Sequence, residues 1–171
     1  AWLDQDERAE PLLAAMEELG VPLILHPEED LERAAAQALN RQMRYAEGLV
    51  LWRTWATTLV LYGFAAGPLL NQFPKLKLVF AHGGGAFWPN AARIDVLFQE
   101  LIPSDDPIVN GQWEGGPPNP SPLEWLRQHE VYFDAAWFDG TALSAAMDRF
   151  GSDRFLFGTD GSAHGKSIGF F

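Results

Sequence analysis

The sequence predicts an α/β protein built on a parallel β-sheet, and three observations support this prediction. Short apolar runs of strand length alternate with longer segments of helical periodicity along the chain. The runs are separated by helices, which is typical of parallel strands joined by helical crossovers. Three of the runs end in a residue that can bind a metal or transfer a proton, namely His26, His82 and Asp160. Because the carboxyl ends of parallel strands lie at one edge, we expect these side chains to converge.

Composition limits the possible partners and metal ligands. The 171 residues are enough for one domain with a sizeable core. With 12 Lys and Arg against 23 Asp and Glu, the net charge is −11. This charge argues against nucleic acid or an anionic membrane as a partner, since both require clustered positive charge. The chain has no cysteine, so any metal must be held by imidazole and carboxylate groups.

No targeting or membrane-spanning segment is recognisable. The first residues lack the basic and apolar regions of a signal peptide. The longest apolar region, residues 49–70, contains Arg53 and is broken by glycine and proline. A membrane span needs about 20 uninterrupted apolar residues, so this region is better explained as a buried helix. Together with the absence of cysteine, these features predict a cytoplasmic protein.

The chain opens with a predicted helix and a predicted strand. Residues 11–19 place Leu12, Met16 and Leu19 on one helical face, and the glycine that follows is a common helix stop. Residues 21–25 are apolar and predict a strand that ends directly before the first histidine.

Two helices are expected between the first and second strands. Residues 31–39 are rich in alanine, and residues 45–65 form a longer segment that is unusually aromatic. Aromatic side chains at helical spacing usually pack in a core or against another subunit, which is the interpretation we favour. A surface that stacks against a ligand is the alternative.

The second predicted strand covers residues 78–81 and leads into His82-Gly83-Gly84-Gly85. Glycine permits close backbone approach and dihedral angles that other residues avoid. A histidine at a strand end beside three glycines is therefore the strongest local indication of a functional site in this chain. A further amphipathic helix is expected to begin after Pro89.

A predicted long loop separates the next helix from the elements described so far. Residues 103–122 are rich in Pro, Gly and Asn and predict a long loop, which in a compact domain is usually functional or disordered. Ser121 then opens a capping box for a short helix. A third strand is predicted at 131–134, a helix at 141–150 and a fourth strand at 155–159.

The predicted strand ends offer the donor atoms of a metal site. His26, His82 and Asp160, together with Asp134 at the end of the third strand, supply two imidazoles and two carboxylates. Such a set can hold Zn²⁺ or a similar ion and leave a position open for water. Each residue also has a structural explanation, because a histidine at a strand end often makes only structural hydrogen bonds. Asp160 precedes a glycine, and Asp-Gly is also a common turn sequence.

Five other residues have weaker indications. His129 is interpreted as a cation near a helix carboxyl end, and His164 stays open between a residue without a role and a neighbour of the site. Phe87, Trp88 and Trp137 follow strand ends. They are candidates for an apolar wall that binds substrate, with core packing as the alternative.

Five segments together resemble the amidohydrolase-related family. The resemblance is strongest to the branch of aminocarboxymuconate-semialdehyde decarboxylase and γ-resorcylate decarboxylase, and it extends from about residue 4 to residue 160. The segments are strand-His26-Pro27, the run from Phe73 through His82 to Gly85, Arg93-Ile94-Asp95, Val131-Tyr132-Phe133-Asp134, and Arg154 to Asp160.

The resemblance implies a fold, a cofactor and roles for the strand-end residues. It implies a distorted (β/α)8 barrel of the TIM type with a divalent metal, usually zinc and sometimes manganese. His26 and Asp160 are implied as metal ligands, His82 as the acid/base that handles the proton, and Asp160 as a proton relay. The implied reaction is non-oxidative decarboxylation of a small unsaturated or aromatic carboxylic acid. A hydrolase acting on a lactone or similar ring is the alternative within the same superfamily.

The sequence also departs from the family pattern. Only strands five to eight of the barrel are represented, and the His-x-His pair of the family's first strand is absent. We therefore expect residues 1–171 to form a single partial domain, either a fragment with its N-terminal half missing or a half-barrel that forms homo-oligomers. A non-catalytic remnant that serves as an interaction protein is a third possibility. Residues 161–171 are an atypical tail without resemblance to the family.

Overall fold

The computed structural model describes residues 7–27, 47–101, 121–136 and 138–161. Several predictions fall outside these residues. They concern the helix at 31–39, nearly all of the loop at 103–122, Trp137, His164, and the tail at 161–171 beyond its first residue.

Four parallel strands form one sheet in the order β1-β2-β3-β4. Neighbouring strands pair in parallel, with Leu25 beside Phe80 and Phe80 beside Phe133. All strands therefore end at the same edge, as predicted. The strands are β1 Leu23–Leu25, β2 Leu78–Phe80, β3 Val131–Asp134 and β4 Phe155–Leu156.

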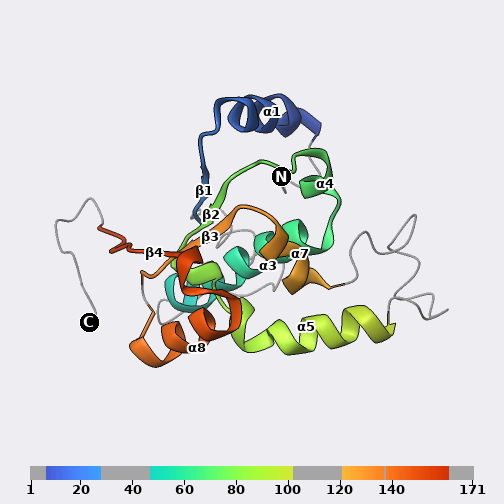
Figure 1. The fold of residues 1–171 in the computed structure, drawn as a ribbon. Coiled ribbons are helices and arrows are strands. Elements are labelled where there is room, and N and C mark those ends of the chain that lie inside the picture. Colours follow the sequence, from blue (N-terminus) through green and yellow to red (C-terminus); the bar gives the residue numbers. More distant parts are fainter. Residues whose placement is uncertain (1–6, 28–46, 102–120, 137, 162–171) are drawn as a thin grey trace.

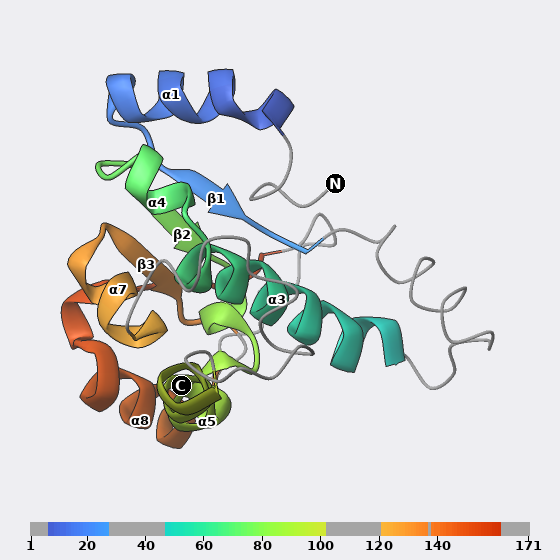
Figure 2. The ribbon, with the colours of Figure 1, turned by 90° about the vertical axis from the view of Figure 1, so that its right-hand side faces the viewer.

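Helices connect the strands and cover one side of the sheet. Figures 1 and 2 show α3, α4 and α7 on the same side of β1, β2 and β3. Among the described residues, none of the helices is long and apolar enough to cross a bilayer. The helices are α1 Glu10–Leu19, α3 Arg53–Ala66, α4 Leu69–Gln72, α5 Phe87–Leu101, α7 Pro122–Gln128 and α8 Gly140–Phe150, with the π-helical turn η2 Gly48–Trp52 before α3 and the 3₁₀ turns η1 Glu7–Ala9, η3 His82–Gly84 and η4 Ser152–Arg154.

An aromatic core joins α3 to the middle of the sheet. Phe64 of α3 contacts Phe80 of β2 with ring centroids 5.9 Å apart, and Phe80 stacks on Phe133 of β3 at 6.1 Å. All three side chains are fully buried, and burial of a phenylalanine contributes about 1.5–3 kcal/mol. The predicted aromatic helix is thus part of the core through Phe64, whereas Trp55 on its other side is half exposed.

The apolar face of α1 identified from the sequence, with Leu12, Met16 and Leu19, is not the face that the structure buries. Leu12 and Leu19 are 54% and 73% exposed, and the fully buried residue is Leu13. Positions 9, 13 and 16 have the same spacing as 12, 16 and 19, so the apolar pattern allowed both faces. The structure selects the face on which Ala9 and Leu13 join the core, with Met16 packed against it.

Both outer strands are shorter than predicted, and at β1 the reason is local. The amide of Val21 donates to the carbonyl of Met16, so this residue completes the helix cap and is not available to start β1. Pro22 has no amide hydrogen to offer. At the other edge, β4 ends at Leu156, and Phe157 is largely exposed.

Two predicted helix starts also differ from the structure. Helix α5 begins at Phe87 and includes Pro89 in its first turn. The first four amides of a helix have no intrahelical acceptor, so proline is tolerated there. In the predicted helix at 45–65, residues 48–52 are π-helical, and α3 follows from Arg53.

Helix α7 begins with the predicted cap and with an additional partner on α5. The hydroxyl of Ser121 accepts a hydrogen bond from the amide of Glu124 at 3.2 Å. The same hydroxyl donates to Oδ1 of Asp95 at 3.0 Å, and the amide of Leu123 donates to that oxygen at 3.2 Å. Asp95, part of the Arg93-Ile94-Asp95 segment, therefore joins α5 to the first turn of α7.

We expect Asp95→Ala to lower the free energy of unfolding by about 1–3 kcal/mol, because the amide of buried Leu123 loses its acceptor. Chemical denaturation measures the effect. Asp148→Ala is the matched control, since it removes an exposed aspartate from α8 and should change stability by less than about 0.5 kcal/mol. Equal stabilities of the two variants would contradict this role of Asp95.

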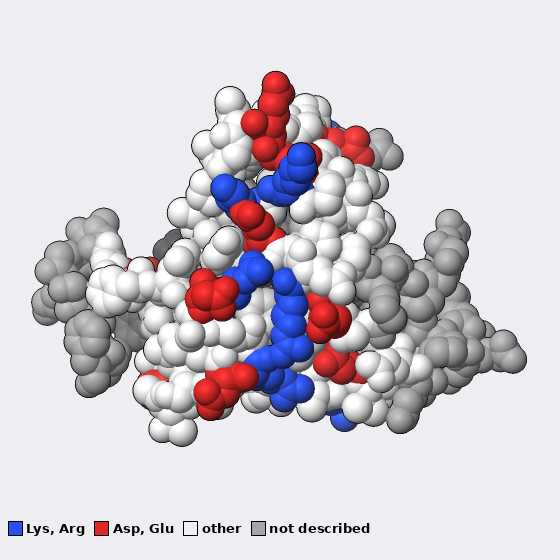
Figure 3. Space-filling view, viewed as in Figure 1, with Lys and Arg blue, Asp and Glu red and all other residues white. Residues whose placement is uncertain are grey.

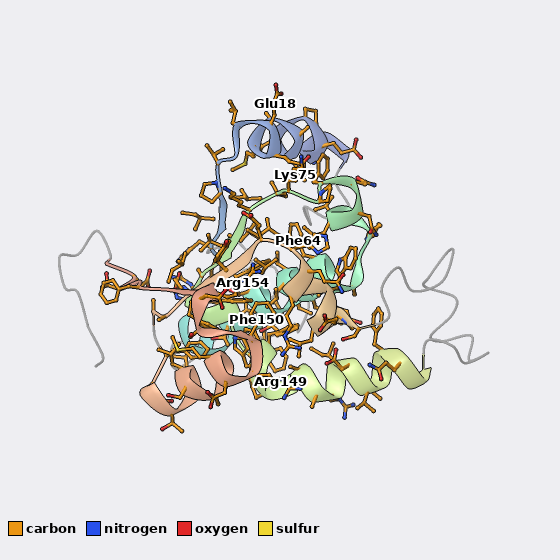
Figure 4. All side chains as sticks on the ribbon, in the orientation of Figure 1. Glu18, Phe64, Lys75, Arg149, Phe150 and Arg154 are labelled. Atoms are coloured by element: carbon orange, nitrogen blue, oxygen red, sulfur yellow. The ribbon has the colours of Figure 1, made fainter. Side chains whose placement is uncertain are left out.

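Several cationic side chains lie near the sheet edge where the strands begin. Figure 3 shows a row of Lys and Arg flanked by Asp and Glu, and Figure 4 labels Arg149 and Arg154 on this face. Lys77 directly precedes β2, and Arg154 directly precedes β4. The guanidinium of Arg154 donates to the carbonyl of His129 at 2.7 Å, which stabilises the end of α7. These cations support the fold at the edge opposite the strand-end histidines.

Candidate metal centre

The segments that follow β1, β2 and β4 bring His26, His82 and Asp160 together. One ligand atom from each residue lies within 4.8 Å of those of the other two. Nε2 of His26 is 3.7 Å from Oδ1 of Asp160, and the two imidazole rings are 5.0 Å apart at 68°. Residues separated by more than 130 positions meet because β1, β2 and β4 run in parallel and end at the same edge.

The backbone is strained at two of these three residues. His82 has φ 53° and Asp160 has φ 47°, and they are the only non-glycine residues with positive φ among those the structure describes. The left-handed conformation costs an L-residue about 1–2 kcal/mol. Strain of this kind persists where surrounding contacts hold the backbone, and it is frequent at functional sites.

Glycine is required in the turn that follows His82. A Cβ on Gly83 would lie 2.0 Å from the ring of Phe138, and one on Gly85 would lie 2.2 Å from the carbonyl oxygen of Thr54. Both glycines also have positive φ. The turn therefore packs directly against the backbone of α3, which confirms the expected close approach and unusual dihedral angles.

Hydrogen bonds from three sides hold this turn. Oδ1 of Asp134 accepts from the amide of His82 at 3.0 Å and from the amide of Ala136 at 3.0 Å. The indole N–H of Trp88 donates to the carbonyl of Gly83 at 2.6 Å. The hydroxyl of Thr58 accepts from the amide of Ala86 at 2.7 Å. Asp134, which the sequence offered as a fourth ligand, thus uses Oδ1 to support the backbone.

The site favours a neutral imidazole at His82. Burial lowers the pKa of His82 below its usual value, because the protonated ring is poorly solvated there. The negative charges of Asp160 and Asp134 oppose this shift, while His26 and Arg53 add to it. Arg53 begins α3, and nothing in the sequence had indicated its influence on the site.

The donor set fits a divalent metal ion. Imidazole nitrogen and carboxylate oxygen are ordinary ligands of zinc and related ions, with bonds of about 2.0–2.2 Å. Two ligands of one ion therefore lie roughly 3–4 Å apart, which agrees with the 3.7 Å between His26 and Asp160. Nδ1 of His82 is buried without a hydrogen-bond partner among the described residues, so an additional group would satisfy it.

The weaker candidates among the described residues, Phe87, Trp88 and His129, are not part of this centre. Phe87 is fully buried and Trp88 is nearly so, and both belong to the hydrophobic core, in agreement with packing, the alternative that the sequence allowed. His129 caps the carboxyl end of α7, with Nδ1 2.8 Å from the carbonyl of Trp125. The sequence did not identify Thr58 or the indole of Trp88 as supports. The three glycines indicated close neighbours without specifying them.

Comparison with known proteins gives a family match and several relatives. The model of the Amidohydrolase family matches residues 1–161. The chain is 28% identical over 156 residues to 2-amino-3-carboxymuconate-6-semialdehyde decarboxylase of Dictyostelium discoideum, covering 88% of this chain and 37% of that protein. It is 36% identical over 72 residues to dihydroorotase of Photorhabdus laumondii, covering 42% of this chain and 15% of that protein.

A solved structure shows the same fold. Dihydroxybenzoic acid decarboxylase from Polaromonas sp. JS666, crystallised with bound manganese and the inhibitor 2-nitroresorcinol, superposes with a TM-score of 0.71 at 21% identity. The match covers 93% of this chain and 44% of that protein. The predicted partial barrel of the TIM type is therefore confirmed, and the chain spans less than half the length of these relatives.

Proposed function

Because this chain belongs to the amidohydrolase family, we propose that it carries the metal- and proton-handling residues of a decarboxylase active site. The proposed substrate is a small unsaturated or aromatic carboxylic acid. The observation that carries the proposal is the convergence of His26, His82 and Asp160 at one sheet edge. The decarboxylases among its relatives support the reaction class.

His26 and Asp160 would hold the metal. Both side chains are partly exposed, as a site that admits a small substrate requires. A divalent ion bound there supplies Lewis acidity toward the carboxylate oxygens of the substrate. Zinc is the ion expected from the sequence resemblance. Manganese is the alternative, because the decarboxylase from Polaromonas contains it.

His82 would move the proton. Decarboxylation breaks the bond between the substrate carbon and its carboxylate, and that carbon needs a proton in exchange for carbon dioxide. Burial lowers the pKa of His82 and so favours the neutral ring, which can accept a proton, while the charges of Asp160 and Asp134 favour the protonated ring. These opposing effects suit a group that both accepts a proton and delivers it through an imidazole nitrogen.

Hydrolysis of a lactone or similar ring is the second candidate. It is favoured by the identity to a dihydroorotase over 72 residues. In that reaction the same groups would activate water and protonate the leaving group. The products distinguish the candidates, since ring opening releases no carbon dioxide.

We expect His82→Asn to reduce carbon dioxide release by about 10²–10⁴-fold, the usual contribution of a general acid/base. The test uses the natural gene product that contains this sequence, loaded with Mn²⁺ or Zn²⁺, with 2,6-dihydroxybenzoate and aminocarboxymuconate semialdehyde as probe substrates. His129→Asn is the control, because it removes an imidazole from the cap of α7. A folded, metal-loaded protein that releases no carbon dioxide from any probe would overturn the decarboxylase proposal.

A further inference from the structure

The position of His82 depends on a backbone conformation that its own residue type disfavours. With φ 53°, His82 is in the left-handed region, and the next three glycines continue with positive φ. The peptide groups around His82 must be held for the imidazole to keep one direction.

Each of these peptide groups has a partner. The amide of His82 donates to Oδ1 of Asp134, and the carbonyl of His82 accepts from the amide of Gly85 at 2.9 Å. The carbonyl of Gly83 accepts from the indole of Trp88. The hydrogen bond between the His82 carbonyl and the Gly85 amide lies within the turn. The other two hydrogen bonds come from side chains of different elements, which hold the His82 amide and the Gly83 carbonyl. Asp134 comes from the end of β3 and Trp88 from the first turn of α5.

The indole of Trp88 is itself held by the core. Its ring packs against Phe133 at 4.9 Å, Phe150 at 5.3 Å and Phe155 at 5.7 Å. These residues belong to β3, α8 and the first position of β4. The donor nitrogen therefore occupies a place set by several elements, and its hydrogen bond to Gly83 is buried.

We propose that Trp88 and Asp134 are positioning residues for His82. They hold two peptide groups of the left-handed turn from different elements and so direct the imidazole toward His26 and Asp160. This inference rests on the proposed function only for the proton-transfer role of His82. Loss of a residue that orients a metal ligand or an acid/base typically lowers activity by about 10–100-fold.

Trp88→Phe and Asp134→Ala test the proposal. The first keeps an aromatic ring and removes the donor, and the second removes the acceptor. In the metal-free protein, the coupling between the amide and α protons of His82 and its Cα shift report φ. In both variants we expect the coupling and the Cα shift of His82 to depart from those of a single left-handed conformer. In the metal-loaded enzyme we expect kcat to fall about 10–100-fold, with KM and metal affinity within about twofold.

Two further variants serve as controls. Asp134→Asn retains an oxygen acceptor and should recover most of the kcat and the NMR values of His82. Trp125→Phe removes an indole whose N–H has no hydrogen-bond partner among the described residues. This variant should leave the kcat and the NMR values of His82 unchanged. Comparing Trp88→Phe with Trp125→Phe separates the loss of the hydrogen bond to Gly83 from the general effect of replacing a tryptophan with phenylalanine.

The outcomes distinguish positioning from the proposed function. Unchanged His82 couplings and kcat in folded Trp88→Phe and Asp134→Ala would overturn the positioning role. If Trp88→Phe does not fold, the Asp134→Ala and Asp134→Asn pair decides. If the unmodified protein releases no carbon dioxide, the decarboxylase proposal fails, whereas loss of the left-handed His82 conformer in the variants still supports positioning.

Discussion

Replacing Gly85 with alanine is expected to lower the free energy of unfolding by about 2–5 kcal/mol. Roughly 1–2 kcal/mol comes from forcing an L-residue into positive φ, and roughly 1–3 kcal/mol from overpacking. The added Cβ would lie 2.2 Å from the carbonyl oxygen of Thr54. That oxygen is part of the backbone of α3, so it cannot move aside as a flexible side chain would. The loss is a large part of the 5–15 kcal/mol that stabilises a typical domain.

Two other glycines separate the contributions to this effect. Gly20 has φ 65° with nothing within 4 Å of its added Cβ, so Gly20→Ala should show only the cost of the left-handed backbone. Gly140 has neither positive φ nor a close neighbour, so Gly140→Ala should be neutral or slightly stabilising. Urea denaturation of the three variants gives the comparison. If Gly85→Ala were no more destabilising than Gly20→Ala, the close packing of the turn against α3 would be refuted.

Removing either proposed ligand is expected to weaken metal binding by more than about 100-fold. Loss of a residue that hydrogen-bonds to a metal ligand typically lowers metal affinity by about 10–100-fold, and loss of the ligand itself should lower it further. His26→Ala and Asp160→Asn are the variants, and isothermal titration calorimetry with Mn²⁺ and Zn²⁺ is the measurement. In the unmodified protein, an ion at 100 times its dissociation constant should stabilise the fold by about 2.7 kcal/mol. Both variants should lose this stabilisation at the same ion concentration.

A third variant and a control define the site further. His82→Asn should weaken metal binding less than the ligand variants do, since His82 is proposed to handle the proton. Asp153→Asn is the control for Asp160, because Asp153 pairs with Arg154 at 3.7 Å and lies before β4, at the opposite edge of the sheet. Equal metal affinities for Asp160→Asn and Asp153→Asn would exclude Asp160 as a ligand.

The strand-end pattern predicted much of the candidate site. Hydrophobic runs that end in His26, His82 and Asp160 were visible in the sequence, and parallel strands necessarily bring such ends to one edge. The supports of the site were not visible. The contact between Trp88 and Gly83 depends on how α5 packs on the aromatic core, and no local pattern encodes that arrangement.

The errors in the fold have a common cause. The buried face of α1 and the length of β1 were each compatible with more than one local solution. Leu13 and Leu12 offered equally good apolar faces, and contact with the core selected Leu13. Val21 has the residue type of a strand, but its amide is used by the cap of α1. In both cases, competition between neighbouring contacts decided the outcome.

The sequence by itself determined the order of the elements, the parallel sheet and the identity of the strand-end donors, because hydrophobic period and glycine position act locally. Only the tertiary structure decided how those donors are held. The left-handed backbone of His82 and its burial arise from contacts with α3, β3 and α5. The physical reason is that strain and desolvation depend on which distant groups surround a residue, and a linear pattern does not contain those neighbours.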